Sequence, residues 1–222
     1  MAAADRTTAS RDRSLATFAG LAIALFGLPS LSGATRALRI DLHPLVTIAA
    51  QWALLGLVVG IAIGIEGRSL RSLGVRRPSR RDAVPLLVAA VFGFLALAAT
   101  GPLIDALGLP ERRVTGLDID RVGVEVAVAS AITIGVVEEA LYRGYAIERL
   151  AEYTGSARLA GGLSVAAFTL SHAVGWRLGD LLQVSLAALV FTLVYLYRRS
   201  LVPVVGAHIA IWLFGVLGAV YG

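Results

Sequence analysis

The sequence predicts an all-α polytopic membrane protein with about seven transmembrane helices. The first observation is the composition, which is 57% hydrophobic and only 16% charged, with a mean hydropathy of +0.79. A soluble domain carries about a quarter charged residues. The second is that the apolar residues form long blocks without a polar stripe, which is typical of helices that face lipid or other apolar helices. The third is that the positive charge, all of it arginine, falls between these blocks.

The apolar blocks define the expected helices, because a transmembrane helix needs about 20 mostly apolar residues. The predicted helices are Leu15–Ala34, Pro44–Ile65, Ala83–Leu107, Val122–Leu150, Ala157–Val174, Leu181–Tyr197 and Leu201–Tyr221. The fourth is too long for a simple crossing, so part of it is expected to tilt or to leave the lipid. The chain is interpreted as a single membrane domain, residues 1–222, in which 1–121 supply the first three helices and 122–222 the last four.

The arginines predict how these helices are oriented. Alternating crossings place the N-terminal tail, the Arg68–Arg81 loop, the Arg143–Arg158 stretch and Arg198–Arg199 on one side, with three, six, three and two arginines respectively. The other side receives the remaining six of the 20. An arginine excess marks the cytoplasmic side, so the N-terminus is predicted to be cytoplasmic, in a bacterial or archaeal cell membrane. Since the positive charge does not collect on one face, nucleic acid is not expected as a partner.

Four ionisable side chains fall well inside predicted helices: Glu138, Glu139, His172 and His208. A charge near the bilayer centre costs about 2.5–3.5 kcal/mol on insertion scales, so such residues indicate function. At about 1.5 Å per residue, Glu138 and His172 lie about 18 Å from one boundary and His208 about 12 Å from it. In a core about 30 Å thick, three helices therefore bring ionisable groups to one layer, which predicts a shared polar site.

The adjacent glutamates are expected to differ in their surroundings. Glu139 and Arg143 are four residues apart, so they can pair on one helix face. Glu138 is rotated by about 100° and can point elsewhere, toward the histidines. Two adjacent carboxylates in a poorly hydrated place do not both ionise easily, and the arginine compensates one of them. Glu138 is left as the candidate general base.

Three short motifs carry a resemblance to a known family. The run from Glu138 to Gly144 reads EEALYRG, and Phe168 to His172 reads FTLSH. These match the EExxxR and FxxxH motifs of the CAAX protease and bacteriocin-processing (CPBP) family of intramembrane proteases, and His208 stands where its third motif, HxxxN or HxxxD, begins. The chain therefore resembles this family, and its type II CAAX prenyl endopeptidase, over roughly residues 122–221. One position departs, since Trp212 replaces the asparagine or aspartate, and an indole can donate a hydrogen bond but not accept one.

The resemblance implies an endopeptidase that cleaves membrane-associated, prenylated or otherwise hydrophobic proteins. In that role Glu138 would activate a water molecule and His172 would help to hold it. Glu139 and Arg143 would order the base, and His208 would stabilise the oxyanion of the tetrahedral intermediate. The implied partners are a membrane-anchored protein or peptide substrate and the lipid bilayer.

Phe168 and Trp212 are assigned a supporting role in packing. The family is classed among metalloproteases, and a divalent metal such as zinc, held by Glu138, His172 and His208, is chemically reasonable. Nothing in the sequence requires the metal, so the cofactor is left unassigned.

Other interpretations remain open at this point. Glu138 and Glu139 can form a structural ion pair with Arg143, and each histidine can make a helix–helix hydrogen bond. A non-catalytic immunity or accessory protein of the same fold is the main functional alternative. A small transporter with a proton relay is a third, against which the lack of a visible inverted repeat counts. Cysteine chemistry is excluded, because the chain has no cysteine.

Overall fold

The computed structural model describes residues 2–111 and 122–221, with side chains from residue 14 onward. The described residues form helices and no β-strand, which confirms the predicted all-α class. The elements are α1 (Ala2–Ala37), α2 (Pro44–Gly60), η1 (Ile61–Ile65), η2 (Leu70–Leu73), η3 (Arg80–Asp82), α3 (Ala83–Ala106), α5 (Val124–Glu138), η4 (Glu139–Ile147), α6 (Glu148–Thr154), α7 (Ala157–His172), α8 (Leu178–Arg198) and α9 (Leu201–Tyr221).

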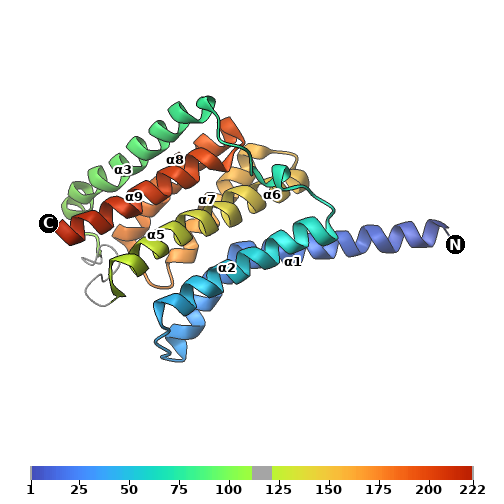
Figure 1. The fold of residues 1–222 in the computed structure, drawn as a ribbon, viewed down its shortest axis with the longest axis horizontal. Coiled ribbons are helices and arrows are strands. Elements are labelled where there is room, and N and C mark those ends of the chain that lie inside the picture. Colours follow the sequence, from blue (N-terminus) through green and yellow to red (C-terminus); the bar gives the residue numbers. More distant parts are fainter. Residues whose placement is uncertain (1, 112–121, 222) are drawn as a thin grey trace.

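The long helical segments run in alternating directions along the chain (Figure 1). In order they are α1, α2 with η1, α3, the continuous stretch from α5 through η4 to α6, then α7, α8 and α9. The first part of α1 projects beyond the bundle, and α3 lies on the opposite side of the bundle from α1 and α2 (Figure 1). Helix α1 begins at Ala2, well before the predicted start at Leu15. The other segments coincide with predicted helices to within a few residues, so the apolar blocks were correctly located.

Five helices of the described chain are long and apolar enough to cross a membrane by length and composition: Ser14–Ala37, Pro44–Ile65, Arg80–Ala106, Leu178–Arg198 and Leu201–Tyr221. The other two predicted spans are helical but differ from this group. Helix α7 has 16 residues, and the stretch from α5 to α6 is divided by the π-helical segment η4. Outward-facing Phe92, Leu193 and Phe214 are all more than half exposed, as expected of side chains that meet lipid.

Helix α8 begins three residues earlier than the apolar pattern predicted. The backbone N–H of Arg177 donates to Asp180 Oδ2 at 2.9 Å, so Asp180 caps the first turn. The predicted end of α7 at Val174 is also shifted, because the helix ends at His172 and a turn follows.

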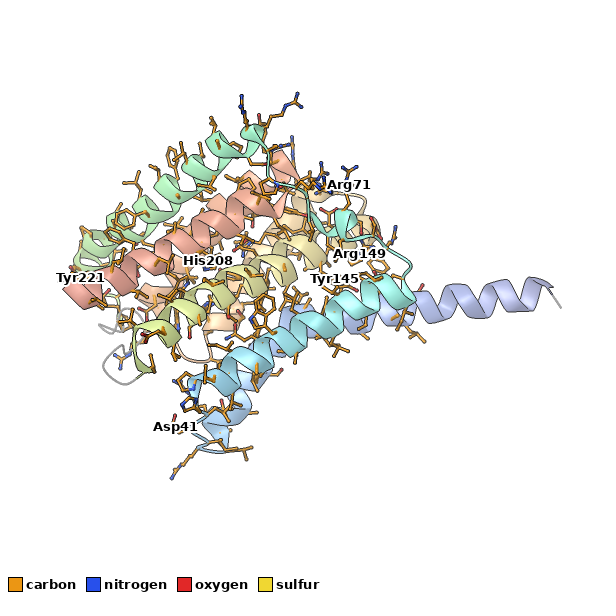
Figure 2. All side chains as sticks on the ribbon, viewed as in Figure 1. Asp41, Arg71, Tyr145, Arg149, His208 and Tyr221 are labelled. Carbon is orange, nitrogen blue, oxygen red and sulfur yellow. The ribbon has the colours of Figure 1, made fainter. Side chains whose placement is uncertain are left out.

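Ion pairs between arginines and acidic residues connect several helical segments at one end of the bundle. Arg198 Nε lies 2.8 Å from Asp82 Oδ1, and Arg199 Nη2 lies 2.8 Å from Glu148 Oε2. Arg149, which is 1% exposed, lies 3.6 Å from the buried Glu66. Figure 2 shows Arg71 and Arg149 at this end, with Asp41 and Tyr221 far from it. Several arginines that were interpreted only as a topology signal therefore also tie neighbouring segments to one another.

The closest approach that matters for the site is between α5 and α9. A side chain at Gly135 would place its Cβ 2.6 Å from Ile209 Cγ1 and 3.1 Å from the backbone nitrogen of Ile209. No larger residue fits there without moving one helix. Glycine at this position therefore lets α9 carry His208 up to the last turn of α5.

Candidate active site

The two glutamates lie where the helix changes its winding. Glu138 is the last residue of α5 and Glu139 the first of η4. π-Helical turns are rare and are frequently found at functional sites. The change of winding occurs inside the EExxxR run, so the two carboxylates that adjoin in sequence face different surroundings.

Glu139 belongs to a buried ion pair, as the four-residue spacing predicted. Its Oε1 accepts from Arg143 Nη1 at 3.0 Å, and both side chains are 0% exposed. Arg143 also donates to the carbonyl of Ala188 on α8 at 3.2 Å. Its guanidinium carbon lies 4.4 Å from the centre of the Phe168 ring. Phe168 therefore does more than pack, because its ring covers the cation of the pair.

His208 joins this pair rather than Glu138. Its Nδ1 lies 2.9 Å from Glu139 Oε1, and its Nε2 accepts from the indole N–H of Trp212 at 3.1 Å. Since the indole can only donate, Nε2 must be the acceptor and Nδ1 must carry the proton. His208 is thus held as one neutral tautomer between Glu139 and Trp212.

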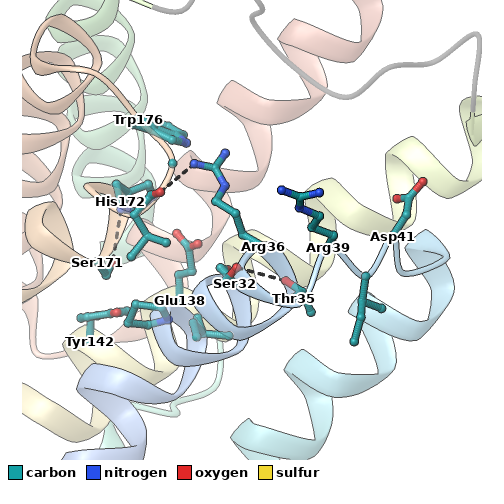
Figure 3. Close-up of a pocket in the computed structure, with 15 residues that line it drawn as sticks. Ser32, Thr35, Arg36, Arg39, Asp41, Glu138, Tyr142, Ser171, His172 and Trp176 are labelled. Atoms are coloured by element: carbon teal, nitrogen blue, oxygen red, sulfur yellow. Dashed lines mark hydrogen bonds between the residues drawn. The ribbon is translucent and has the colours of Figure 1, made fainter.

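Glu138 instead lines a cavity of about 540 Å³ together with His172. The Glu138 side chain is 17% exposed, and its Oε2 lies 4.0 Å from His208 Nε2, too far for a hydrogen bond. A second cavity of about 310 Å³ reaches Glu138 from the side of Gln51. Figure 3 shows Glu138 and His172 on the same wall of the larger cavity. The expectation that Glu138 faces both histidines therefore holds for His172, whereas the close approach at Gly135 places His208 beside Glu139.

The orientation of His172 follows from its place at the end of α7. Its Nδ1 lies 2.8 Å from the carbonyl oxygen of Phe168, which can only accept, so Nδ1 carries the proton. The ring lies edge-on to Trp176, with the ring centres 4.6 Å apart. Nε2 is left as the acceptor, and no hydrogen bond to it is formed within the described part of the chain. His172 can therefore accept a hydrogen bond from water in the cavity.

The three ligands suggested for a metal do not converge. No group of three or more His, Asp or Glu side chains in the described chain is placed to hold a metal ion. Both ring nitrogens of His208 are already engaged, by Glu139 and by Trp212. The arrangement of Glu138, His172 and His208 therefore does not fit a metal centre.

The cavity also has a wall that the motifs did not predict. The residues that line it are Ser32, Thr35 and Arg36 near the end of α1, Arg39 just after α1, and Trp176 after α7. The arginines had been interpreted only by the side of the membrane on which they fall. A signal was present, because Glu138 at about 18 Å from one boundary is only about 12 Å from the other in a core about 30 Å thick. The loops at that second boundary were therefore within reach of the site.

Residues 122–214 match the family model for type II CAAX prenyl endopeptidase Rce1-like. This region is an Rce1-like domain. The match begins just before α5 and ends within α9, so it contains every motif residue, and the predicted resemblance to the CPBP family is confirmed there. A search of curated proteins and a search of solved structures gave no match. The chain is thus an integral membrane protein whose Rce1-like domain belongs to a peptidase family, and α1, α2 and α3 lie outside the matched region.

Proposed function

We propose that the chain is an intramembrane endopeptidase in which Glu138 activates water to cleave a peptide bond of a membrane-associated substrate. The observation that carries the proposal is the separation of the two glutamates. Glu138 faces a cavity beside His172, while the adjacent Glu139 is buried against Arg143 and His208. The carboxylate of Glu138 is therefore accessible to water and substrate. The carboxylate of Glu139 stabilises the arrangement of the site.

The reaction uses groups that face the cavity. A water molecule donates one hydrogen bond to Glu138 and the other to His172 Nε2. As its oxygen attacks the carbonyl carbon, Glu138 takes the first proton, and the carbonyl becomes a tetrahedral oxyanion. Glu138 then gives this proton to the amide nitrogen and the C–N bond breaks. The carboxylic acid formed passes the second proton of the former water to the amine, so a carboxylate and an ammonium group leave. General base and acid roles of this kind need a carboxylate within hydrogen-bond reach of the water.

The buried cluster of Glu139, Arg143 and His208 holds the general base, Glu138, in position. Glu139 accepts from Arg143 and from His208, so its charge is compensated within the protein interior. Because Glu138 directly precedes Glu139 in the backbone, fixing the position of Glu139 also fixes the Cα of Glu138. Glu139, Arg143 and His208 are therefore positioning residues in the arrangement observed.

The experiment is a cleavage assay on purified protein in lipid nanodiscs. The substrate is a quenched fluorescent peptide with a membrane anchor, and mass spectrometry identifies the broken bond. Cleavage by the wild type and its loss in Glu138→Gln support the proposal, and added chelator tests for metal dependence as a separate arm. If several such peptides survive incubation with folded wild-type protein, the chain is instead a non-catalytic member of this fold.

The tryptophan at position 212 is expected to limit the rate of peptide cleavage. Its indole N–H is committed to His208 Nε2, so neither ring can donate to an oxyanion while this bond lasts. Trp212→Asn offers an amide N–H instead, and one oxyanion donor is worth about 10²–10³ in kcat. We therefore expect kcat to rise in Trp212→Asn, by about tenfold or more, when steady-state cleavage is measured at a temperature where both proteins are folded.

Trp212→Phe is the control for this prediction, because it keeps a ring but has no N–H. It removes the donor to His208 and adds no new one, so it is not expected to reproduce the gain of Trp212→Asn. A lower kcat in Trp212→Asn would contradict the argument and would mean that the indole itself acts on the intermediate.

The cavity is lined by residues at the end of the bundle where α1 and α7 end. The arginine distribution predicts that this end is outside the cytoplasm, so we propose that the substrate enters from the outer face. The absence of cysteine allows single-cysteine labelling. In intact cells a membrane-impermeant maleimide is expected to label Asp41→Cys and not Arg71→Cys, and the reverse result would place the cavity on the cytoplasmic side.

A further inference from the structure

A glutamine side chain interrupts the apolar helix α2 close to Glu138. Gln51 comes seven residues after Pro44, the first residue of α2, so it lies about 10 Å from that end of the helix. It lines the cavity of about 310 Å³ that also contains Glu138. Polar side chains inside membrane helices are costly and indicate function, so the presence of Gln51 here calls for a physical reason.

The side-chain amide of Gln51 has no structural partner. Its Oε1 is buried and accepts no hydrogen bond, and its Nε2 donates none, within residues 14–111 and 122–221. A buried amide that is left unpaired destabilises a protein. The next residue shows the contrast, because the indole N–H of Trp52 donates to Thr133 Oγ1 on α5 at 3.1 Å. Docking of α2 on α5 therefore accounts for Trp52 and leaves Gln51 unexplained.

Amide side chains are rare in this protein. The sequence contains no asparagine and two glutamines, Gln51 and Gln183. Gln183 donates to the carbonyl of Leu97 at 3.3 Å and so joins α8 to α3. It lines neither of the two cavities that contain Glu138. Gln51 is therefore the amide side chain that can reach a substrate beside Glu138.

The proposed hydrolysis requires a hydrogen-bond donor for the oxyanion. The indole N–H of Trp212 is bonded to His208, so it does not serve this purpose. Two hydroxyl groups on the wall of the larger cavity are also engaged, because Tyr142 and Ser171 donate to backbone carbonyl groups. Both N–H groups of the Gln51 amide remain available.

Glu138 faces His172 in one cavity and Gln51 in the other. It lines both cavities, whereas His172 lines the larger one and Gln51 the smaller one. The attacking water is held between Glu138 and His172 in the proposed reaction, so the oxyanion can form on the side of Gln51. A sphere of about 310 Å³ is about 8 Å across, which leaves room for an N–H···O hydrogen bond of about 2.9 Å from Gln51 to that oxygen.

We propose that the side-chain amide of Gln51 is a catalytic hydrogen-bond donor that stabilises the oxyanion formed beside Glu138. This inference rests on the proposed peptidase function and adds to it a residue of α2, which lies outside the matched family region. The contact of Trp52 with Thr133 fixes α2 against α5, so the donor is in place before the substrate arrives, as such stabilisation requires. The amide is unpaired because its partner forms only during the reaction.

Gln51→Leu tests this role, because leucine has a similar size, suits an apolar helix and cannot donate a hydrogen bond. Loss of one oxyanion donor lowers kcat by about 10²–10³, and this loss is expected in steady-state cleavage of the membrane-anchored peptide in nanodiscs. The melting temperature should stay the same or rise, since the variant removes an unpaired buried amide. Gln183→Leu is the matched control, because it makes the same substitution at the other amide and should leave kcat unchanged.

A tetrahedral analogue of the substrate separates catalysis from substrate binding. A phosphinate group in place of the cleaved peptide bond carries a charged oxygen where the oxyanion forms, and such analogues bind about 10²–10⁸-fold more tightly than substrates. Gln51→Leu is expected to weaken phosphinate binding by about 10²–10³. Binding of the intact peptide, measured by fluorescence anisotropy in the Glu138→Gln background to prevent cleavage, should not change.

The outcomes for Gln51 and for the peptidase proposal are distinguishable. If Glu138→Gln abolishes cleavage and Gln51→Leu keeps the wild-type kcat, the peptidase proposal stands and the role of Gln51 is wrong. Equal weakening of phosphinate and intact peptide by Gln51→Leu would also overturn that role, because the amide would then only hold the substrate. A clear fall in the melting temperature of Gln51→Leu would make the amide structural. If the wild type cleaves no peptide, the peptidase proposal fails and the role of Gln51 fails with it.

Discussion

Glutamine in place of Glu138 is expected to lower kcat for peptide cleavage by about 10²–10⁴, the usual contribution of a general base or acid. Glutamine keeps the size of the side chain and its ability to accept a hydrogen bond, but it cannot take a proton from water. The side chain of Glu138 faces a cavity and is 17% exposed. Glu138→Gln should therefore leave the melting temperature of the protein nearly unchanged. Differential scanning fluorimetry can measure this alongside the cleavage assay.

Glu139→Gln is the matched control, because it makes the same change at the next residue. Glu139 is 0% exposed and accepts from both Arg143 and His208, so loss of its charge should lower the melting temperature clearly. A lower rate in Glu139→Gln should accompany this loss of stability. If Glu139→Gln abolishes cleavage in a stable protein and Glu138→Gln remains active, the two assignments are reversed.

The features that sequence could predict are those fixed by spacing along one helix. Apolar blocks of span length located the helices, and the distance of four residues predicted the contact between Glu139 and Arg143. The offset of about 100° between adjacent residues predicted that Glu138 would face another direction. Each of these depends on local geometry that any helix repeats.

The features that sequence could not predict depend on how helices meet. The placement of His208 beside Glu139 follows from the close contact of α5 and α9 at Gly135, and nothing in the local pattern near His208 shows it. Trp212 occupies the position where the third motif has asparagine or aspartate. Its hydrogen bond to His208 likewise could not be predicted from the sequence. The cavity wall at Arg36 and Arg39 comes from the end of α1 and the residues just after it. These lie over 90 residues before Glu138 and outside the matched family region.

Alanine in place of Arg143 is expected to lower the free energy of unfolding by about 3–5 kcal/mol, the range for breaking one half of a buried ion pair. Arg143 is 0% exposed, and it neutralises Glu139, contacts the carbonyl of Ala188 and lies over the Phe168 ring. Its removal leaves the Glu139 charge in a poorly hydrated interior with only the neutral His208 beside it. Reversible denaturation in mild detergent measures the loss.

The double variant Glu139→Gln with Arg143→Met should recover much of that loss, because it removes both charges and keeps the apolar stem of the arginine. Recovery is expected because a buried pair replaced by neutral groups of similar size is often as stable as the original. Arg68→Ala provides the exposed comparison, since its pair with Glu152 is about half exposed on both sides and should contribute only about 0–1 kcal/mol. If Arg143→Ala proves as mild as Arg68→Ala, the Glu139 carboxylate takes up a proton or reaches water when its partner is lost, and the buried pair does not set the stability of the site.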